Sequence, residues 1–143
     1  KRLIDVGVRI IDVAGAGGTS WAGVEILRRS DNKEIDWNPF WDWGIRTTDA
    51  LQEVVFLKQR TPQLTVVSSG GITNGLDCAK SIALGADLAS SARPMIKALM
   101  NGGQKSLKQK IEQWMREYTG AMFLIGASST TQLRNSKALQ RKK

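Results

Sequence analysis

Short, nearly continuous runs of apolar residues alternate along the chain with longer segments in which apolar residues recur every three or four positions. The runs at residues 8–13 and 64–67 are rich in Val, Ile and Leu, and a third, short strand is predicted at residues 87–91. Such runs are typical of parallel strands that are buried on both faces. The longer segments predict amphipathic helices between and after the strands.

Capping residues indicate where these helices begin and end. The predicted starts are marked by Thr19 or Ser20, Thr47 or Thr48, Asn74, and Pro94 within a first turn. The helix after Asn74 stops at Gly85, and an earlier one ends before Pro62. From about residue 104 a long amphipathic helix is predicted, and a short turn at residues 130–135 closes the chain. The predicted inward positions include Trp21, Val24, Ile26, Leu27, Leu51, Val54, Val55, Leu57, Leu107, Ile111, Trp114, Met115 and Tyr118.

The order strand, helix, strand, helix, strand, helices predicts parallel βα repeats in an α/β fold. Three parallel strands leave two unpaired edges. A closed eight-stranded βα barrel takes about 250 residues, whereas this chain has 143. We therefore expect the chain to be a portion of something larger.

Two glycine-rich turns follow the first two predicted strands, AGAGGTSW and SSGGITNG. Glycine lets the backbone approach a ligand closely, and the amides that open a helix attract anions. Gly70 and Gly71 precede one helix start, and Ala92 and Arg93 precede the next. The sequence predicts that both turns lie at the same end of the sheet and form one phosphate site. A tight turn without a ligand is the alternative for each.

The net charge is +8, but the ten residues 134–143 carry five basic groups and no acid. Without them the chain has 16 basic and 13 acidic residues. A basic terminal segment of this kind is typical of a disordered, solvated tail. We therefore expect no nucleic-acid partner, although a polyanion-binding tail stays as an alternative.

The chain contains no histidine and one cysteine, Cys78. The lack of histidine removes the commonest acid/base group at neutral pH and any histidine metal ligand. Cys78 lies on the apolar side of a predicted helix, which favours a small core residue over a nucleophile. No apolar stretch reaches the length of a membrane span. We expect a cytoplasmic protein with no membrane partner.

The five tryptophans divide into two groups. Trp21 and Trp114 occupy apolar helical positions, which predicts that both are in the core. Trp37, Trp41 and Trp43 gather with Phe40 in a loop, where aromatic residues usually cover a surface. Asp36 and Asp42 in this loop are interpreted as solvated acids rather than metal ligands.

The motifs DVAGAGGTSW, DWGIRT, SSGGITNGLD, ALGAD, ARP and AMFLIGA together resemble the C-terminal half of the type 2, FMN-dependent isopentenyl-diphosphate delta-isomerases. The resemblance covers residues 1–133, followed by the tail 134–143. It implies a (β/α)8 TIM-type barrel of which this chain holds strands six to eight. It also implies FMN contacts, with the phosphate on residues 71–73 and 92–93. The implied cofactor-binding residues are Ala14, Thr19, Gly70, Gly71, Ile72, Thr73, Ala92 and Arg93. Thr73 replaces an arginine common in the family, which leaves backbone amides for the phosphate there.

The resemblance further implies interconversion of isopentenyl and dimethylallyl diphosphate in isoprenoid biosynthesis, with reduced FMN, Mg²⁺ and NADPH as the reductant. In the family, the metal ligand and the substrate-binding histidine and glutamine lie in the N-terminal half. No catalytic residue and no metal ligand are therefore expected in this chain, which alone should be inactive. A homo-oligomer, tetramer or octamer, is also implied.

Two other interpretations stay open. One is an FMN-dependent barrel oxidoreductase of the 2-hydroxy-acid oxidase type, which usually carries a histidine where this chain has residues 14–18. The other is a non-catalytic half-barrel fragment that serves as a binding module.

Overall fold

The computed structural model describes residues 1–29 and 38–140. Its centre is a parallel sheet of β1 (Ile10–Ala14), β2 (Thr65–Ser69) and β3 (Leu88–Ala89) in the order β1-β2-β3. Val13 pairs with Ser68, and Val67 pairs with Leu88. The predicted parallel strands are confirmed. The third strand is shorter than predicted, because only two of its residues form ladder pairs with β2.

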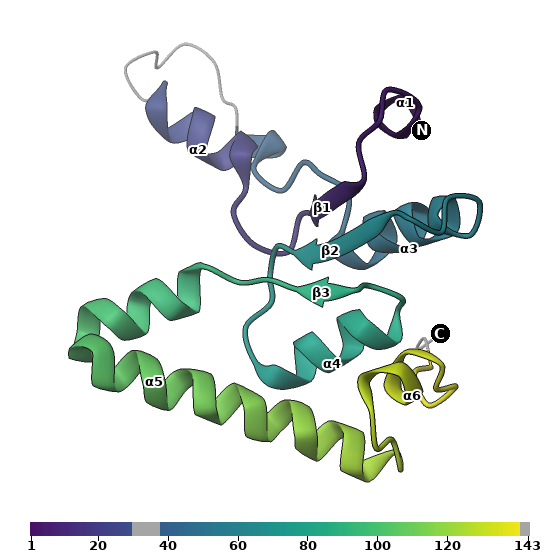
Figure 1. Ribbon diagram of the computed structural model, residues 1–143. Helices are drawn as coiled ribbons and strands as arrows, with labels where there is room; N and C mark the ends of the chain where they lie inside the picture. The colour runs from purple at the N-terminus through teal and green to yellow at the C-terminus, as the bar shows by residue number, and fades with distance from the viewer. Residues whose placement is uncertain (30–37, 141–143) are drawn as a thin grey trace.

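The described part of the chain also contains seven helices (Figure 1). They are α1 (Arg2–Asp5), α2 (Trp21–Arg28), the 3-10 helix η1 (Asn38–Phe40), α3 (Thr47–Lys58), α4 (Gly75–Ala83), α5 (Arg93–Leu124) and α6 (Thr130–Arg134). Helices α3 and α4 connect consecutive strands, so the predicted βα repeats are present. Within the described residues, no helix combines the length and the apolar character needed to cross a membrane.

Two of the predicted caps are confirmed and one is wrong. Ser20 accepts a hydrogen bond from the Gly23 amide (2.9 Å), and Asn74 accepts one from the Asp77 amide (2.8 Å). Neither threonine caps α3, because Thr47 is already its first residue. The Thr47 hydroxyl instead donates to the Gly70 carbonyl oxygen (2.7 Å).

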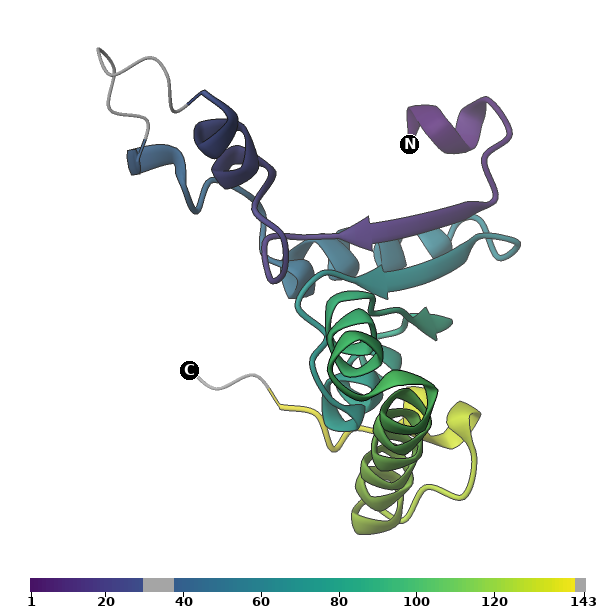
Figure 2. The same cartoon turned by 90° about the vertical axis from the view of Figure 1, so that its left-hand side faces the viewer.

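Helix α5 bends sharply at Gly102 and Gly103, whose dihedral angles are not helical. The bend separates a short first half from the long helix predicted to start near residue 104. Figure 2 shows the second half returning alongside α4. Trp114 in this half is only 8% exposed, as predicted, but Ile111 and Met115 are exposed. Those two predictions are wrong, because no described element covers that side of α5.

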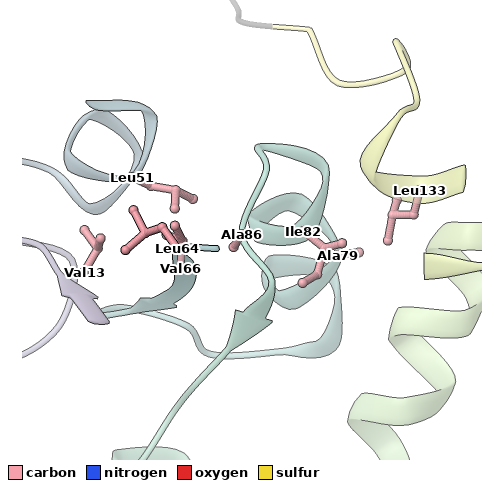
Figure 3. Packing of buried hydrophobic residues seen from close by; sticks show 8 residues of the cluster. All are labelled: Val13, Leu51, Leu64, Val66, Ala79, Ile82, Ala86 and Leu133. Atoms are coloured by element: carbon pink, nitrogen blue, oxygen red, sulfur yellow. The ribbon is translucent and has the colours of Figure 1, made fainter. Parts of the chain in front are cut away.

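The hydrophobic core lies on one face of the sheet (Figure 3). Val13 and Val66 of the sheet contact Leu51 of α3, and Ile82 of α4 and Leu133 of α6 extend the cluster. Residues of the opposite face are much more open: Ile10 is 66% exposed and Leu88 is 57% exposed. A βα barrel buries that inner face under layers of side chains. The three repeats therefore have the burial pattern of part of a barrel.

An ion-pair cluster ties the ends of three elements together at the start of β3. The Asp87 carboxylate accepts from the Lys58 ammonium and from the Val66 amide, and Arg134 lies 3.5 Å away. Partial burial by itself would raise the pKa of Asp87, but these partners outweigh it and hold the pKa below its ordinary value. Arg134, the first residue of the predicted disordered tail, is thus part of α6 and of this cluster.

Helix α2, which begins at Trp21, lies beyond the ends of the strands (Figure 1). Trp21 is 75% exposed, so its predicted place in the core is wrong; α2 projects away from the sheet and has no core there to join. Trp41 packs on Gly23, whose added Cβ would be 3.2 Å from the indole. The rings of Phe40 and Trp43 contact each other at a tilt of 58°, with centroids 5.8 Å apart. Trp37 and Asp36 fall outside the described residues.

Candidate phosphate-binding site

One cavity of about 390 Å³ opens at the carboxyl ends of the three strands, between the glycine turns and the start of α5. All eight residues predicted for cofactor binding line it: Ala14, Thr19, Gly70, Gly71, Ile72, Thr73, Ala92 and Arg93. The sequence did not single out five further lining residues, Asp12, Trp21, Ser69, Ser90 and Ser91, for this site. The topology accounts for this convergence, because the ends of parallel strands meet at one edge of the sheet.

The two glycine turns are interlocked. Gly70 and Gly71 both have φ of +84°, which favours glycine. A Cβ added at Gly71 would lie 2.5 Å from the Gly17 carbonyl carbon, and one added at Gly70 would lie 2.6 Å from the Gly15 carbonyl oxygen. The prediction that both turns share one end of the sheet is confirmed. The reason for glycine is corrected: these positions make room for the other turn as well as for any ligand.

The start of α5 presents open backbone amides. Ala92 precedes the helix without a capping side chain, and Pro94 has no N–H. In the part of the chain that the structure describes, the amides of Gly71, Ile72, Ala92 and Arg93 have no hydrogen-bond acceptor. These four amides border one cavity, and a helix N-terminus carries a partial positive charge. Arg93 itself lines the cavity and carries a positively charged side chain.

The start of α4, in contrast, is closed by protein acceptors. Asn74 accepts from the Asp77 amide, and the Glu117 carboxylate of α5 accepts from the Gly75 amide (2.7 Å). The sequence predicted two helix N-termini aimed at one phosphate. The structure leaves only that of α5 open, because the Asn74 and Glu117 side chains already accept from amides of the other.

Thr73 does not offer a free amide either. Its N–H donates to the Asp77 carboxylate at 3.1 Å, and its hydroxyl donates to the same oxygen at 2.8 Å. The Thr73 amide is thus already paired, and the expectation that it holds a phosphate stays a prediction. The amides of Gly71 and Ile72 are the open ones in this turn.

A carboxylate also lies on the inner face of the sheet beside the cavity. Asp12 of β1 accepts a hydrogen bond from the Ser69 hydroxyl of β2 (2.6 Å), and both side chains line the cavity. The signal for this pair was present in the sequence, because Asp12 is the one charged residue within the apolar run 10–14.

The described residues contain no group of three or more His, Cys, Asp and Glu side chains close enough to bind a metal ion. Cys78 is half-buried in α4, and burial raises the pKa of its thiol, with further increases from the charges of Asp77 and Glu117. A raised pKa disfavours the nucleophilic thiolate, which agrees with the prediction of a structural role.

A family model described as FMN-dependent dehydrogenase matches residues 1–141. The chain belongs to this family. The cavity at the carboxyl ends of the strands is therefore the candidate cofactor site of a family member.

The curated relatives of the chain share the name of one enzyme within this broad family. The chain is 46% identical over 146 residues to an isopentenyl-diphosphate delta-isomerase of Chlorobaculum parvum, a match that covers 95% of this chain and 40% of the relative. It is 39% identical over 135 residues to the isopentenyl-diphosphate delta-isomerase of Pyrococcus furiosus, covering 93% of this chain and 33% of the relative. The chain thus spans about 40% or less of the length of these relatives.

Among solved structures, a mandelate oxidase variant determined with an FMN adduct superposes with a TM-score of 0.69 at 26% sequence identity. The match covers 93% of this chain and 35% of that protein. The fold of the three βα repeats is therefore shared with a flavin-dependent oxidase as well.

Proposed function

We propose that this chain supplies the FMN-phosphate site of an FMN-dependent isopentenyl-diphosphate delta-isomerase, which interconverts isopentenyl and dimethylallyl diphosphate. The observation that carries the proposal is the 46% identity to a curated isomerase, together with a cavity that presents four open amides and Arg93. In this proposal the strands β1, β2 and β3 are strands six to eight of a (β/α)8 barrel.

The residues present fit a phosphate monoester. The amides of Gly71, Ile72, Ala92 and Arg93 would hold the dianion, since charge-assisted hydrogen bonds to oxyanions are the strong ones. Ala14 and Thr19 would lie along the rest of the cofactor, on the opposite turn. Reduced FMN would supply the acid/base group for a 1,3-allylic proton shift. This chain would bind and orient that cofactor.

The remaining requirements are proposed to lie elsewhere in the protein. Mg²⁺ would neutralise the diphosphate, NADPH would keep the flavin reduced, and the substrate-anchoring groups would come from an N-terminal half-barrel. We further propose a cytoplasmic homo-oligomer. The exposed inner face of the sheet, with Ile10 and Leu88, supports a larger barrel, because an apolar sheet face is stable only when it is covered.

A 2-hydroxy-acid oxidase is the second candidate, and the mandelate oxidase neighbour favours it. Against it stand the lower identity of 26% and the lack of any histidine in the 143 residues. An oxidase of this type would use a histidine base at the end of the strand that corresponds to β1.

The deciding experiment uses the protein expressed from the full reading frame that encodes this chain. With reduced FMN and Mg²⁺, it should convert isopentenyl diphosphate to dimethylallyl diphosphate and should not oxidise mandelate or lactate. Oxidation of a 2-hydroxy acid without isomerisation would reject the proposal in favour of the second candidate.

Arg93 provides the residue-level test. Arg93→Ala removes one charged group from the rim but leaves the four amides, so the FMN dissociation constant should rise by about 10-fold. Riboflavin, which lacks the phosphate, should bind equally well to both proteins. Lys97→Ala, one turn further along α5 and outside the cavity, is the matched control and should leave FMN affinity unchanged. An Arg93→Ala protein with full FMN affinity would remove Arg93 from the phosphate site.

A further inference from the structure

The four open amides belong to two segments that are about 20 residues apart in the chain. Gly71 and Ile72 follow β2, whereas Ala92 and Arg93 open α5. The ladder between β2 and β3 ends at the pair of Ser68 and Ala89, and the Ser90 amide adds one bond to the Ser68 carbonyl oxygen. Beyond that point the sheet no longer aligns the two segments.

Ser91 makes the connection past the end of the sheet. Its hydroxyl donates to the Ile72 carbonyl oxygen at 2.6 Å, and the bond is partly buried. Ile72 itself is a buried side chain, so its carbonyl is attached to a fixed point of the fold. Because Ser91 directly precedes Ala92, this bond ties the second glycine turn to the start of α5.

The same peptide group is held from its other side. In a trans peptide the carbonyl of one residue and the N–H of the next point in opposite directions, and none of the described peptide bonds is cis. The Ile72 carbonyl accepts from Ser91, while the Thr73 N–H donates to Asp77 at 3.1 Å. The side chains of Ser91, before α5, and Asp77, in α4, thus hold the peptide group between Ile72 and Thr73 from both sides.

This bonding adds to the packing of Gly70 and Gly71 on the first turn and to the Thr47 bond to Gly70, because neither of those contacts fixes the peptide between Ile72 and Thr73. Gly70 and Gly71 both sit at positive φ, and glycine has more accessible backbone conformations than any other residue. Fixing the peptide between Ile72 and Thr73 limits the directions in which the amides of Gly71 and Ile72 can point. Those amides are two of the four that would hold the phosphate in the proposed site.

We propose that Ser91 and Asp77 are positioning residues that clamp the peptide between Ile72 and Thr73, and so align the amides of Gly71 and Ile72 with those of α5 for one phosphate. The proposal rests on the proposed FMN site. Neither side chain needs to touch the ligand for the clamp to act.

The test compares FMN with riboflavin in protein expressed from the full reading frame. Ser91→Ala should weaken FMN binding by about 10-fold, the effect of losing one hydrogen bond and the order that it imposes. Riboflavin affinity should stay within about twofold, because the clamp acts only on the phosphate end. Ser91→Thr retains the hydroxyl and should restore FMN binding.

The matched control is Ser129→Ala. Ser129 also makes one hydroxyl hydrogen bond, as the N-cap of α6 accepting from the Gln132 amide at 3.2 Å, but it lies away from the cavity. It should lower stability without changing FMN affinity. Flavin fluorescence titration measures affinity, and urea unfolding measures the stability of every variant.

Two variants of Asp77 separate the effect of its hydrogen bond to Thr73 from the effect of its negative charge. Asp77→Asn keeps an oxygen that can accept from the Thr73 N–H but removes a negative charge beside a dianion site, so FMN affinity should be unchanged or higher. Asp77→Ala removes the acceptor and should weaken FMN binding about as much as Ser91→Ala.

The outcomes distinguish the two levels of the proposal. If wild-type protein binds FMN no better than riboflavin, the phosphate site itself is rejected and the clamp with it. If wild-type protein prefers FMN and Ser91→Ala keeps that full preference, the phosphate site stands and the clamp is rejected. Equal losses for FMN and riboflavin would also reject the clamp, since they would mean a general structural defect.

Discussion

Gly71→Ala tests whether the two glycine turns hold each other in place. Gly71 has φ of +84°, and a Cβ there would lie 2.5 Å from the Gly17 carbonyl carbon. Gly126, just after α5, has a similar φ of +72° but no heavy atom within 4 Å of an added Cβ. The pair therefore separates the cost of the backbone conformation from the cost of the contact between the turns.

The expected magnitudes follow from these two positions. Placing an L-residue at positive φ costs about 1 kcal/mol, so Gly126→Ala should lower the free energy of unfolding by about that amount. Gly71→Ala carries the same cost and adds a clash with backbone atoms, which cannot rotate away as a side chain can. Overpacking of this kind costs about 1–3 kcal/mol, so the total for Gly71→Ala should be about 3 kcal/mol.

Urea unfolding of the two variants and the wild type, followed by circular dichroism, measures the difference. FMN titration on the same samples should show a loss for Gly71→Ala only, because the displaced turn carries two of the open amides. Such a loss would not by itself prove phosphate contact at Gly71, which is why the Arg93 and Ser91 variants are needed. Equal destabilisation of the Gly71 and Gly126 variants would refute the interlocking of the turns.

Two further predictions concern the ion-pair cluster and the cysteine. Asp87→Asn should cost about 2 kcal/mol near neutral pH, because it weakens the bonds to Lys58 and Val66. The folded-state pKa of Asp87 is lowered, so its contribution is present above the ordinary value of about 3.9 and is lost as the pH falls through the lower folded value. Urea unfolding should therefore show the variant and wild type converging in strong acid; a constant difference would contradict this. Cys78 should react with a thiol reagent at pH 8 more slowly than free cysteine, because burial raises its pKa, and urea should remove the difference. Peptide mass spectrometry measures this labelling, and a rate equal to that of free cysteine would contradict the raised pKa of the Cys78 thiol.

The sequence was informative wherever the cause is local. Apolar runs predicted β1 and β2, Asn74 predicted the start of α4, and Gly85 predicted its end, where φ is +107°. The positions of both glycine turns followed from the strand order alone, since the ends of parallel strands share one edge. The eight predicted cofactor residues consequently line one cavity.

The sequence was misleading wherever a distant partner decides the outcome. Threonine is a common helix N-cap, but the Thr47 hydroxyl donates instead to the carbonyl oxygen of Gly70, 23 residues away. Trp21 and Met115 lie at apolar helical positions, yet no described element covers them. A periodic pattern shows which face of a helix is apolar, but it does not show what that face contacts.

The bend in α5 explains why only one of the two helix starts is open to an anion. Gly102 and Gly103 redirect the chain so that the second half of α5 returns alongside α4 (Figure 2). The contact is close: a Cβ at Gly75 would lie 2.7 Å from the Glu117 Cβ, and glycine there lets the Glu117 carboxylate reach the Gly75 amide. The helix that begins at the cavity therefore closes the competing N-terminus with its own second half. A second anion at α4 would have to displace Glu117 and approach Asp77, so the arrangement favours a ligand with a single phosphate on the α5 side.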